Sequence, residues 1–240
     1  MPAPDLGAVV IRESLKRSGL AADKVQTLVM GNVIQASVKM NPARQAGIGA
    51  GLPVEVPALT VNRVFGSGAQ GIVSAALEVW TGMTDCAIAG GMENMDRAPY
   101  LFPQGRGGAR MGDATMFDST LYDGLNDAFS GKHSGWHTED LVIKNGISRD
   151  DQDRWALRSQ QNFSAAQAAG KFVAEIAPVE VPGRKGPGQR RRWRHRTWTS
   201  HRCERCGARH ATDALHAARR AETRHRRAVH RRRPGHRIGA

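Results

Sequence analysis

The ten residues from Asn62 to Gly71, NRVFGSGAQG, form a glycine-rich turn between two apolar runs. A strand that ends in such a turn and opens into a helix directs backbone N–H groups and the positive end of the helix toward the turn, which favours an anion or a thiolate there. The side chain of Phe65, inside the turn, interacts favourably neither with these N–H groups nor with the positive end of the helix. The stretch therefore predicts a site for negative charge that holds a benzyl side chain.

Residues Gly66 to Gly71 also spell G-x-G-x-x-G, the pattern of a dinucleotide-binding turn. Asp85 lies 19 residues beyond Gly66 but precedes the next apolar run, whereas the ribose-binding acid belongs at the carboxyl end of a strand. The serine-hydrolase pattern G-x-S-x-G fails, because Phe65 and Ala69 flank Ser67 at that spacing. A structural interpretation stays open, in which small residues let a helix pack closely on a strand.

The elements that must position this turn alternate between helices and strands. Helices are predicted from Asp5 as N-cap to Gly19, and from Asn41 as N-cap to Gly51. Short apolar or β-branched runs predict strands at 25–34, 57–64 and 86–95, the last of them buried. This alternation is typical of an α/β fold with a mostly parallel sheet, in which ligands gather at the carboxyl ends of the strands.

The predicted helix that follows the turn covers residues 69–83. Its buried face is expected to comprise Ile72, Ala75, Ala76 and Val79. Residues 96–137 are rich in Gly, Asp and Pro without periodicity, so they predict a long surface excursion. A further helix is expected from Ser148 to Gly170, with an extended segment over residues 172–181.

Residues 5–182 resemble the amino-terminal half of thiolases, enzymes that make or cleave 3-ketoacyl-CoA. The resemblance rests on four stretches in the family's order and at its approximate spacing. They are GNVIQASVKMNPARQAGIGAGLPVEVPALTVNRVFGSG, AIAGGMENMDRAPY, LYDGLNDAF and GISRDDQDRWALRSQQNFSAAQAAGKFVAEIAPVEV. The resemblance implies a thiolase-like layered α/β domain over residues 1–182, including a loop excursion at about 96–170.

The resemblance also implies roles for individual residues. The family's nucleophilic cysteine precedes Gly-Ser-Gly at a helix amino terminus, and Phe65 stands at that position. A benzyl group can neither ionise nor accept an acyl group, so the chain is expected to be inactive by the family's route. Leu125 and His133 match residues that touch CoA, and Ser134 replaces a methionine that usually follows that histidine. CoA thioesters are then the expected ligands, with no separate cofactor and no metal.

The resemblance further implies that parts of the thiolase fold are absent. The family begins with a strand ahead of the first helix, and its second half supplies a histidine, an Asn-Glu-Ala-Phe segment and a second cysteine. Neither that histidine in its Gly-His-Pro turn nor the Asn-Glu-Ala-Phe segment follows Val181. Loss of the first strand and of the second half predicts weak stability and exposed apolar patches. Family members form homo-oligomers, whereas this chain is expected to aggregate.

Residues 183–240 form an Arg- and His-rich tail with 19 Lys and Arg against three acidic residues, so the tail accounts for the whole net charge of +13. Its few aliphatic residues predict disorder. A zinc-like spacing occurs at His201, Cys203, Cys206 and His210. Arginine runs interleaved with tryptophans would bind nucleic acid without sequence preference. A shift of the reading frame near residues 186–189 would explain both the tail and the end of the resemblance.

The sequence holds no run of about 20 apolar residues and no signal-peptide pattern at its start. Its three cysteines, Cys86, Cys203 and Cys206, form no disulfide framework. These features favour a cytoplasmic protein that does not bind membranes. Three functions stay open: an acyltransferase of fatty acid metabolism that is expected to be inactive, a nucleic-acid-binding protein acting through the tail, and an inactive partner subunit of a complete thiolase.

Overall fold

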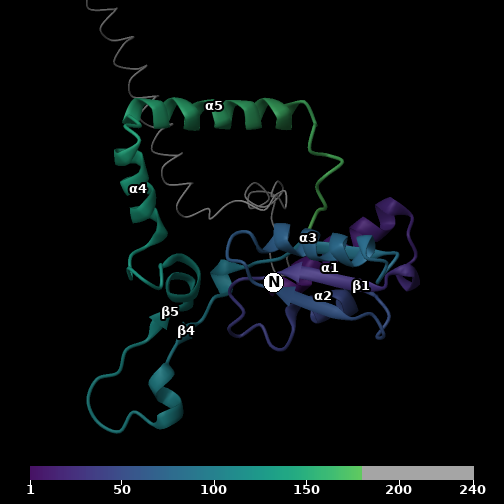
Figure 1. Cartoon of the computed structure of the whole chain (residues 1–240), viewed down its shortest axis with the longest axis horizontal. Helices are drawn as coiled ribbons and strands as arrows, with labels where there is room; N and C mark the ends of the chain where they lie inside the picture. The colour runs from purple at the N-terminus through teal and green to yellow at the C-terminus, as the bar shows by residue number, and fades with distance from the viewer. Residues whose placement is uncertain (180–240) are drawn as a thin grey trace, which may run out of the picture. The chain divides into compact units, whose positions relative to one another are not determined.

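The computed structural model describes residues 1–179, which divide into two compact units (Figure 1). Within this range the first unit comprises residues 1–134 and 175–179, and the second comprises residues 135–174. The helices and strands of the first unit are α1 (Ala3–Ser18), β1 (Thr27–Gly31), α2 (Pro42–Ala50), β2 (Ala58–Val61), α3 (Ser67–Trp80), β3 (Ala87–Gly91), β4 (Tyr100–Leu101) and β5 (Phe117–Asp118). Short helical turns lie at Ala22–Lys24, Met95–Arg97, Pro103–Gly107 and, in π-helical form, Thr120–Leu125.

The first three strands form one parallel sheet in the order β2-β1-β3. Leu28 at the centre of the sheet pairs with Ala58 on one side and Ile88 on the other. The three predicted strands and the α/β fold with a parallel sheet are therefore confirmed, although each strand is shorter than expected. Because the strands are parallel, their carboxyl ends meet at one edge of the sheet, which the turn after β2 also occupies.

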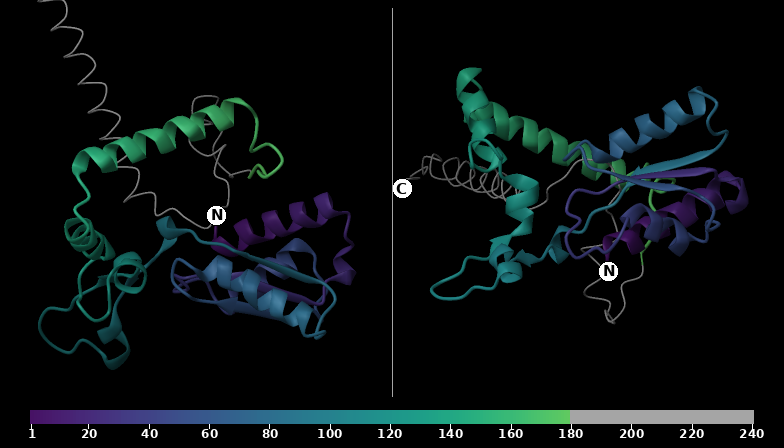
Figure 2. Two further views of the ribbon diagram at one scale, coloured as in Figure 1. Left: turned by 45° about the horizontal axis from the view of Figure 1, so that its top comes forward. Right: turned by 60° about the horizontal axis from the view of Figure 1, so that its bottom comes forward.

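Helices cover both faces of this sheet, α1 and α2 on one and α3 on the other (Figure 2). The main core lies under α1 and α2, where Ile11, Ala46, Leu28 and Met30 are buried together. Val29, also fully buried, alternates to the face beneath α3. The end of β2 and the start of α3 therefore lie against a sheet whose central strand is fully packed.

Local signals set the ends of the first two helices. Asn41 precedes α2, and its side-chain oxygen accepts a hydrogen bond from the backbone N–H of Arg44 at 3.2 Å. Gly19 and Gly51 follow α1 and α2 with φ of 69° and 92°, a left-handed conformation that glycine adopts without strain. These three predicted boundary residues are confirmed.

Two other local predictions are wrong. Asp5 is not the N-cap of α1, because the helix begins at Ala3 after Pro2, and Asp5 lies in the first turn. Its carboxylate there still favours the positive end of the helix. β3 is also less buried than expected: four of its five residues are only partly buried, because it lies at the edge of the three-stranded sheet.

The predicted buried face of α3 is wrong as well. Of the expected residues Ala75 is buried, but Ile72 and Val79 are 58% and 39% exposed. The helix instead turns Ser67, Gly71 and Ala75 toward the sheet. A Cβ on Gly71 would lie 3.0 Å from a carbonyl oxygen of β3, so small residues allow this close approach. Because α3 is apolar on both sides, periodicity alone could not choose between them.

The excursion after β3 contains more structure than the sequence predicted. β4 and β5 pair as an antiparallel ribbon, and the π-helical turn Thr120–Leu125 follows them. A helix, α4 (Ser134–Lys144), begins within the stretch that was expected to be irregular. No residue of α4 is buried, and its large apolar side chains, among them Trp136, Leu141 and Ile143, are exposed.

The second unit comprises most of α4 and the long helix α5 (Arg149–Ala168). Ser148 caps α5 as predicted, with its hydroxyl accepting from the backbone N–H of Asp151 at 3.1 Å. Residues 171–175 form turns, so the extended segment expected over 172–181 is wrong at its start. Along residues 1–179, no helix combines the length and the apolar character that crossing a bilayer requires.

Candidate functional site

The turn after β2 is held by hydrogen bonds that do not involve the side chain of Phe65. The hydroxyl of Ser67 accepts from the backbone N–H of Arg63 at 2.9 Å and donates to the carbonyl oxygen of Val64. The backbone N–H of Gly66 donates to the carbonyl oxygen of Arg63 at 3.0 Å. Ser67 is only 4% exposed, so its hydroxyl stabilises the turn and does not replace a nucleophile.

Phe65 lies two residues before α3, with half of its surface exposed. The preceding Val64 has φ of 48°, a left-handed conformation that a β-branched residue rarely adopts and that costs about 1 to 3 kcal/mol. α3 begins without a side-chain cap, so its first N–H groups and positive end face the turn. Such surroundings lower the pKa of a thiol, and a phenyl ring makes no use of them.

Two glycines let this turn and α3 approach the sheet. A Cβ on Gly31, at the end of β1, would lie 2.5 Å from the backbone of Ser67. A Cβ on Gly71 would lie 3.0 Å from the carbonyl oxygen of Gly90. Close packing therefore accounts for the last glycine of G-x-G-x-x-G. Asp85 precedes β3, at the opposite edge of the sheet from the turn, so the structure does not favour the dinucleotide interpretation.

A partly buried carboxylate, which the sequence did not predict, links the loops that follow β1 and β3. Glu93 accepts hydrogen bonds from the backbone N–H groups of Val33 at 2.7 Å and Ile34 at 3.2 Å, and from the side-chain amide of Asn32 at 2.9 Å. Burial raises the pKa of Glu93, while these hydrogen bonds oppose the increase. The available signal was an acid directly after a strand that ends in glycines at the carboxyl edge of the sheet.

The loop after β1 also joins the Phe65 turn to the segment before α4. Asn62, at the start of the turn, donates its side-chain amide to the carbonyl oxygen of Val33 at 3.3 Å. On the other side, the side chain of Ile34 packs against Gly124, where a Cβ would come within 3.2 Å of it. The loop therefore connects two segments that lie about sixty residues apart in the chain.

The remaining candidate residues belong to this second segment. Leu125 is buried at the end of the π-helical turn. The next residue, Asn126, forms an antiparallel bridge with His133. Leu125 and His133 are thus brought together in one hairpin, and Ser134 follows as the first residue of α4. Since Leu125 is 7% exposed, it supports this hairpin from within.

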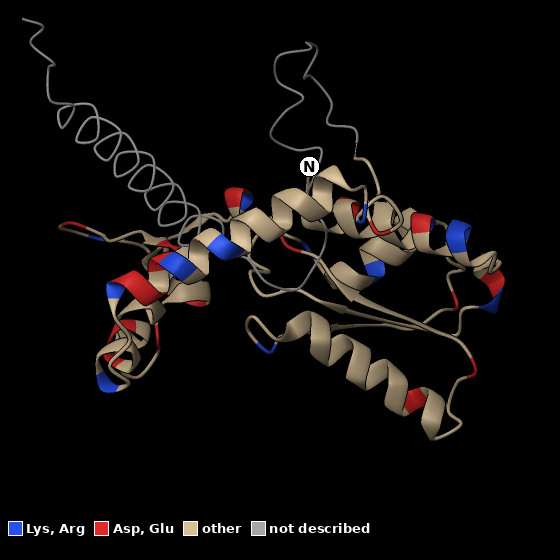
Figure 3. Cartoon of the chain, turned by 90° about the horizontal axis from the view of Figure 1, so that it is seen from above, with Lys and Arg blue, Asp and Glu red and all other residues tan. Residues whose placement is uncertain are grey.

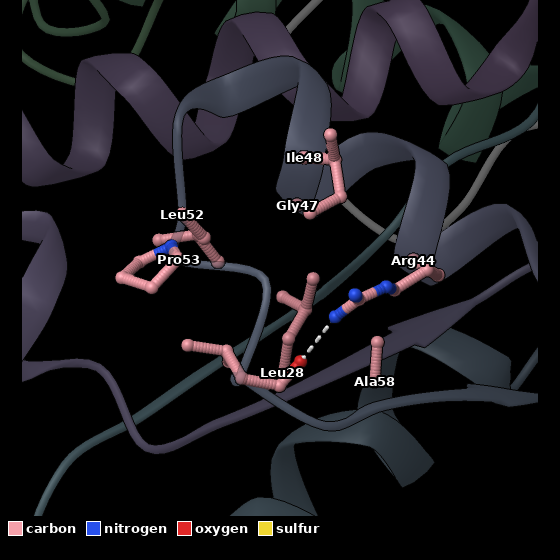
Figure 4. A pocket seen from close by; sticks show the side chains of 8 residues that line it. Leu28, Arg44, Gly47, Ile48, Leu52, Pro53 and Ala58 are labelled. Carbon is pink, nitrogen blue, oxygen red and sulfur yellow. Dashed lines mark hydrogen bonds between the residues drawn. The ribbon is translucent and has the colours of Figure 1, made fainter.

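A depression beside α2 is a packing feature (Figure 4). Its lining consists of Leu28, Arg44, Gly47, Ile48, Leu52, Pro53, Val56 and Ala58. The guanidinium of Arg44 donates to the carbonyl oxygens of Val54 and Val56, both at 2.7 Å. These hydrogen bonds direct the one cation of the lining onto the chain's own backbone, and the other lining side chains are apolar or glycine.

The candidate groups of the tail lie outside the described residues. These are the zinc-like set His201, Cys203, Cys206 and His210 and the arginine runs around them.

A parallel α/β sheet with a glycine-rich turn at its carboxyl edge defines a class of domain that binds ligands at this edge. Residues 1–198 match the family described as "Thiolase, N-terminal domain". Over 186 residues, 78% of the chain, the sequence is 47% identical to an acetyl-CoA acetyltransferase of Cupriavidus necator and 48% identical to one of Pseudomonas aeruginosa. A probable acetyl-CoA acyltransferase of Staphylococcus aureus is 47% identical over the same length.

The chain belongs to the thiolase family. Its matched part corresponds to 47% of each of these relatives, so the chain spans about half of their length. The fold implied by the resemblance is therefore confirmed for the amino-terminal domain.

Proposed function

We propose that this chain is a thiolase amino-terminal domain that cannot take up an acyl group, because Phe65 stands at the position of the family's nucleophilic cysteine. In the family, acyl transfer between 3-ketoacyl-CoA and CoA passes through a thioester on that cysteine. A benzyl group offers no lone pair for attack on a thioester carbonyl. The domain therefore keeps the family fold and lacks the first chemical step, with acetyl-CoA and related thioesters as its ligand class.

The observation that carries this proposal is the place of Phe65 beside the uncapped amino end of α3. The turn around it depends on hydrogen bonds of Arg63, Val64 and Ser67, none of which uses the residue 65 side chain. The turn can thus hold a cysteine or a phenylalanine without rearrangement. A role in fatty acid metabolism and a cytoplasmic location belong to the same proposal and rest on the family alone.

Incubation with acetyl-CoA, followed by intact-protein mass spectrometry, tests the missing step. The unaltered chain is expected to gain no acetyl group and to cleave no acetoacetyl-CoA. Phe65→Cys is the matched variant that restores a nucleophile, and Phe65→Ala is the control that opens the same space without one. Acetylation of the unaltered chain within the turn, or steady cleavage of acetoacetyl-CoA by it, would contradict the proposal.

Contact with CoA is proposed for the hairpin that holds Leu125 and His133, with Ser134 beside them. The pairing of Asn126 with His133 supports this assignment, because it holds the histidine next to the buried leucine. Isothermal titration with CoA should show weaker binding for His133→Ala than for the parent chain. His137→Ala, at an exposed position of α4, is the control. Equal binding by all three chains would refute the contact.

The tail supports a second candidate, nucleic-acid binding, through its 19 Lys and Arg. The competing explanation is a shift of the reading frame near residues 186–189. The nucleotide sequence separates them: a frame past codon 186 that encodes Asn-Glu-Ala-Phe and Gly-His-Pro segments would support the shift. Its absence would refute the shift and leave the tail as a native segment.

A role as partner subunit of a complete thiolase is the third candidate. The apolar side chains exposed along α3, among them Leu77 and Trp80, favour some partner. Co-purification of the chain with a complete, active relative would support this role. If the chain does not bind such a relative when the two are mixed, the result would count against this role.

A further inference from the structure

The loop that directly follows β1, residues 32–34, is attached at its start to both neighbouring strands. The backbone N–H of Asn32 donates to the carbonyl oxygen of Val61, the last residue of β2, at 3.1 Å. The side-chain amide of Asn32 donates to the carbonyl oxygen of Met92, directly after β3, at 3.2 Å. Asn32 is 1% exposed, so water competes little for these bonds. The start of the loop therefore has a defined position relative to the sheet.

The next two residues of the loop are held by one charged group. The three strands of the sheet contain no charged residue, as Figure 3 shows, and Glu93 follows β3 by two residues. One oxygen of its carboxylate, Oε2, accepts from the backbone N–H groups of both Val33 and Ile34. Hydrogen bonds to an ionised acceptor are about twice as strong as those between neutral groups. The position of Val33 and Ile34 therefore depends on Glu93.

The two residues that Glu93 holds contact the two candidate segments of the site. The carbonyl oxygen of Val33 accepts from the side chain of Asn62 in the Phe65 turn. The side chain of Ile34, which is 5% exposed, lies against Gly124 at the head of the hairpin formed by residues 125–133. A displacement of the loop would therefore change both contacts together.

We propose that Glu93 is a positioning residue, which fixes the hairpin of residues 125–133 relative to the Phe65 turn. Glu93 acts through the backbone of Val33 and Ile34, and the loop transmits its position to both segments. An acyl-CoA joins its acyl carbon to the rest of CoA by a chain of fixed length, so a site for it needs its parts at a set spacing. This consequence for CoA rests on the contact proposed above for His133, whereas the positioning itself does not.

A positioning role differs from a general contribution to stability in where its loss is felt. The hydrogen bonds of Glu93 join loops at the carboxyl edge of the sheet, and the main core lies under α1 and α2. Local opening requires less free energy than unfolding of the whole domain. Removal of the carboxylate should therefore loosen the loop and the hairpin before it loosens the core.

Hydrogen–deuterium exchange of the full chain, followed by mass spectrometry, tests the positioning. Glu93→Ala is expected to speed amide exchange about tenfold or more in residues 32–34 and 120–133, with a smaller effect in α1 and α2. Glu93→Gln keeps an oxygen that can accept, so it should restore most of the protection. Glu55→Ala, which removes an exposed acid between α2 and β2, is the matched control.

A second variant tests the link from the loop to the hairpin and does not depend on Glu93→Ala folding. Ile34→Ala should speed exchange in residues 120–133 and leave the amide of Val33 protected. Unchanged exchange of the hairpin in both Glu93→Ala and Ile34→Ala would overturn the proposal. An equal increase in every part of the domain in both variants would also overturn it, because the role would then be general stability.

Isothermal titration with CoA tests the consequence for the ligand. Glu93→Ala should weaken binding, and adding His133→Ala to it should weaken binding little further, because a displaced histidine contributes little. Effects that multiply as if independent would overturn the action of Glu93 through the hairpin. Absence of CoA binding by the parent chain would instead refute the proposed CoA contact, and the exchange measurement would still decide the positioning.

Discussion

Residue 65 offers the most direct test of reactivity, because its turn keeps the same hydrogen bonds whatever side chain it carries. Phe65→Cys should place a thiol at the positive end of α3, where its pKa falls below the ordinary value near 8.5. We expect iodoacetamide to label this thiol faster than Cys86 at neutral pH. Steady cleavage of acetoacetyl-CoA should stay absent, since each missing acid or base typically costs a factor of 10² to 10⁴.

Joining Phe65→Cys to the carboxyl-terminal half of a complete thiolase, with the family's first strand restored, is the positive control and should give turnover. The rate of alkylation against pH, followed by mass spectrometry, reports the thiol separately from catalysis. If the simple Phe65→Cys chain cleaved acetoacetyl-CoA steadily after removal of host thiolase, the acid and base would have to reside in this domain.

A second prediction at this scale concerns Glu93. Glu93→Ala leaves the N–H groups of Val33 and Ile34 and the amide of Asn32 without their acceptor, which should lower the free energy of unfolding by about 1 to 3 kcal/mol. Glu93→Gln should cost less, because an amide oxygen can still accept from the two backbone groups. Urea unfolding at neutral pH measures both. Equal stability of the alanine variant and the parent would show that this link is dispensable.

The pH dependence of stability supplies a third prediction. Burial raises the pKa of Glu93 above its value of 4.5 in the unfolded chain, so between the two pKa values the folded protein binds more protons. The contribution of Glu93 to stability should therefore rise as pH falls from neutral through the raised pKa, and level off below the unfolded value. Relative to Glu93→Gln, the parent should gain stability over this window, and a constant difference would contradict the assignment.

Among the contacts between elements, the one between β1 and the start of α3 leaves the least space for an added side chain. A Cβ on Gly31 would lie 2.5 Å from the backbone of Ser67, whereas a Cβ on Gly90 would meet only the flexible side chain of Met30 at 3.5 Å. Gly31→Ala should therefore lower the free energy of unfolding by about 1 to 3 kcal/mol, and Gly90→Ala should change it little. Thermal unfolding of the two variants compares them directly. A larger loss of stability for Gly90→Ala than for Gly31→Ala would contradict the assignment of the tight contact to β1.

For the whole molecule, the separation of charge between the domain and the tail makes a further prediction. Deleting residues 183–240 removes 19 Lys and Arg and should abolish binding to duplex DNA, measured by fluorescence anisotropy at low salt. Binding by the full chain should weaken steeply as salt rises. The thermal transition should stay in place after deletion, because the core of the described residues consists of residues between Ala3 and Met92. If DNA binding survived the deletion, residues 1–182 would be responsible for it instead of the tail.

Much of the fold follows from local signals. The strands β1 to β3, the caps at Asn41 and Ser148, and the glycines that follow α1 and α2 were predicted because each depends on residues within one turn or one strand. α4 was missed, because it begins inside the Gly-, Asp- and Pro-rich stretch that was expected to be irregular. The Phe65 turn and the segment from Leu125 to Ser134 were named as candidate sites from the sequence and stay predictions. The carboxylate of Glu93, which hydrogen-bonds to the loop after β1, was not predicted.

The sequence by itself determined the order of the first three strands and the helices between them, the phenylalanine at the head of α3 and the confinement of the net positive charge to the tail, because these are properties of neighbouring residues. Only the tertiary structure decided which side of α3 meets the sheet, since both sides are apolar and the choice depends on how closely Gly71 can approach the sheet. It likewise decided that Glu93 binds a loop sixty residues earlier in the chain. Contacts of this kind depend on shape and burial in three dimensions, which local periodicity does not carry.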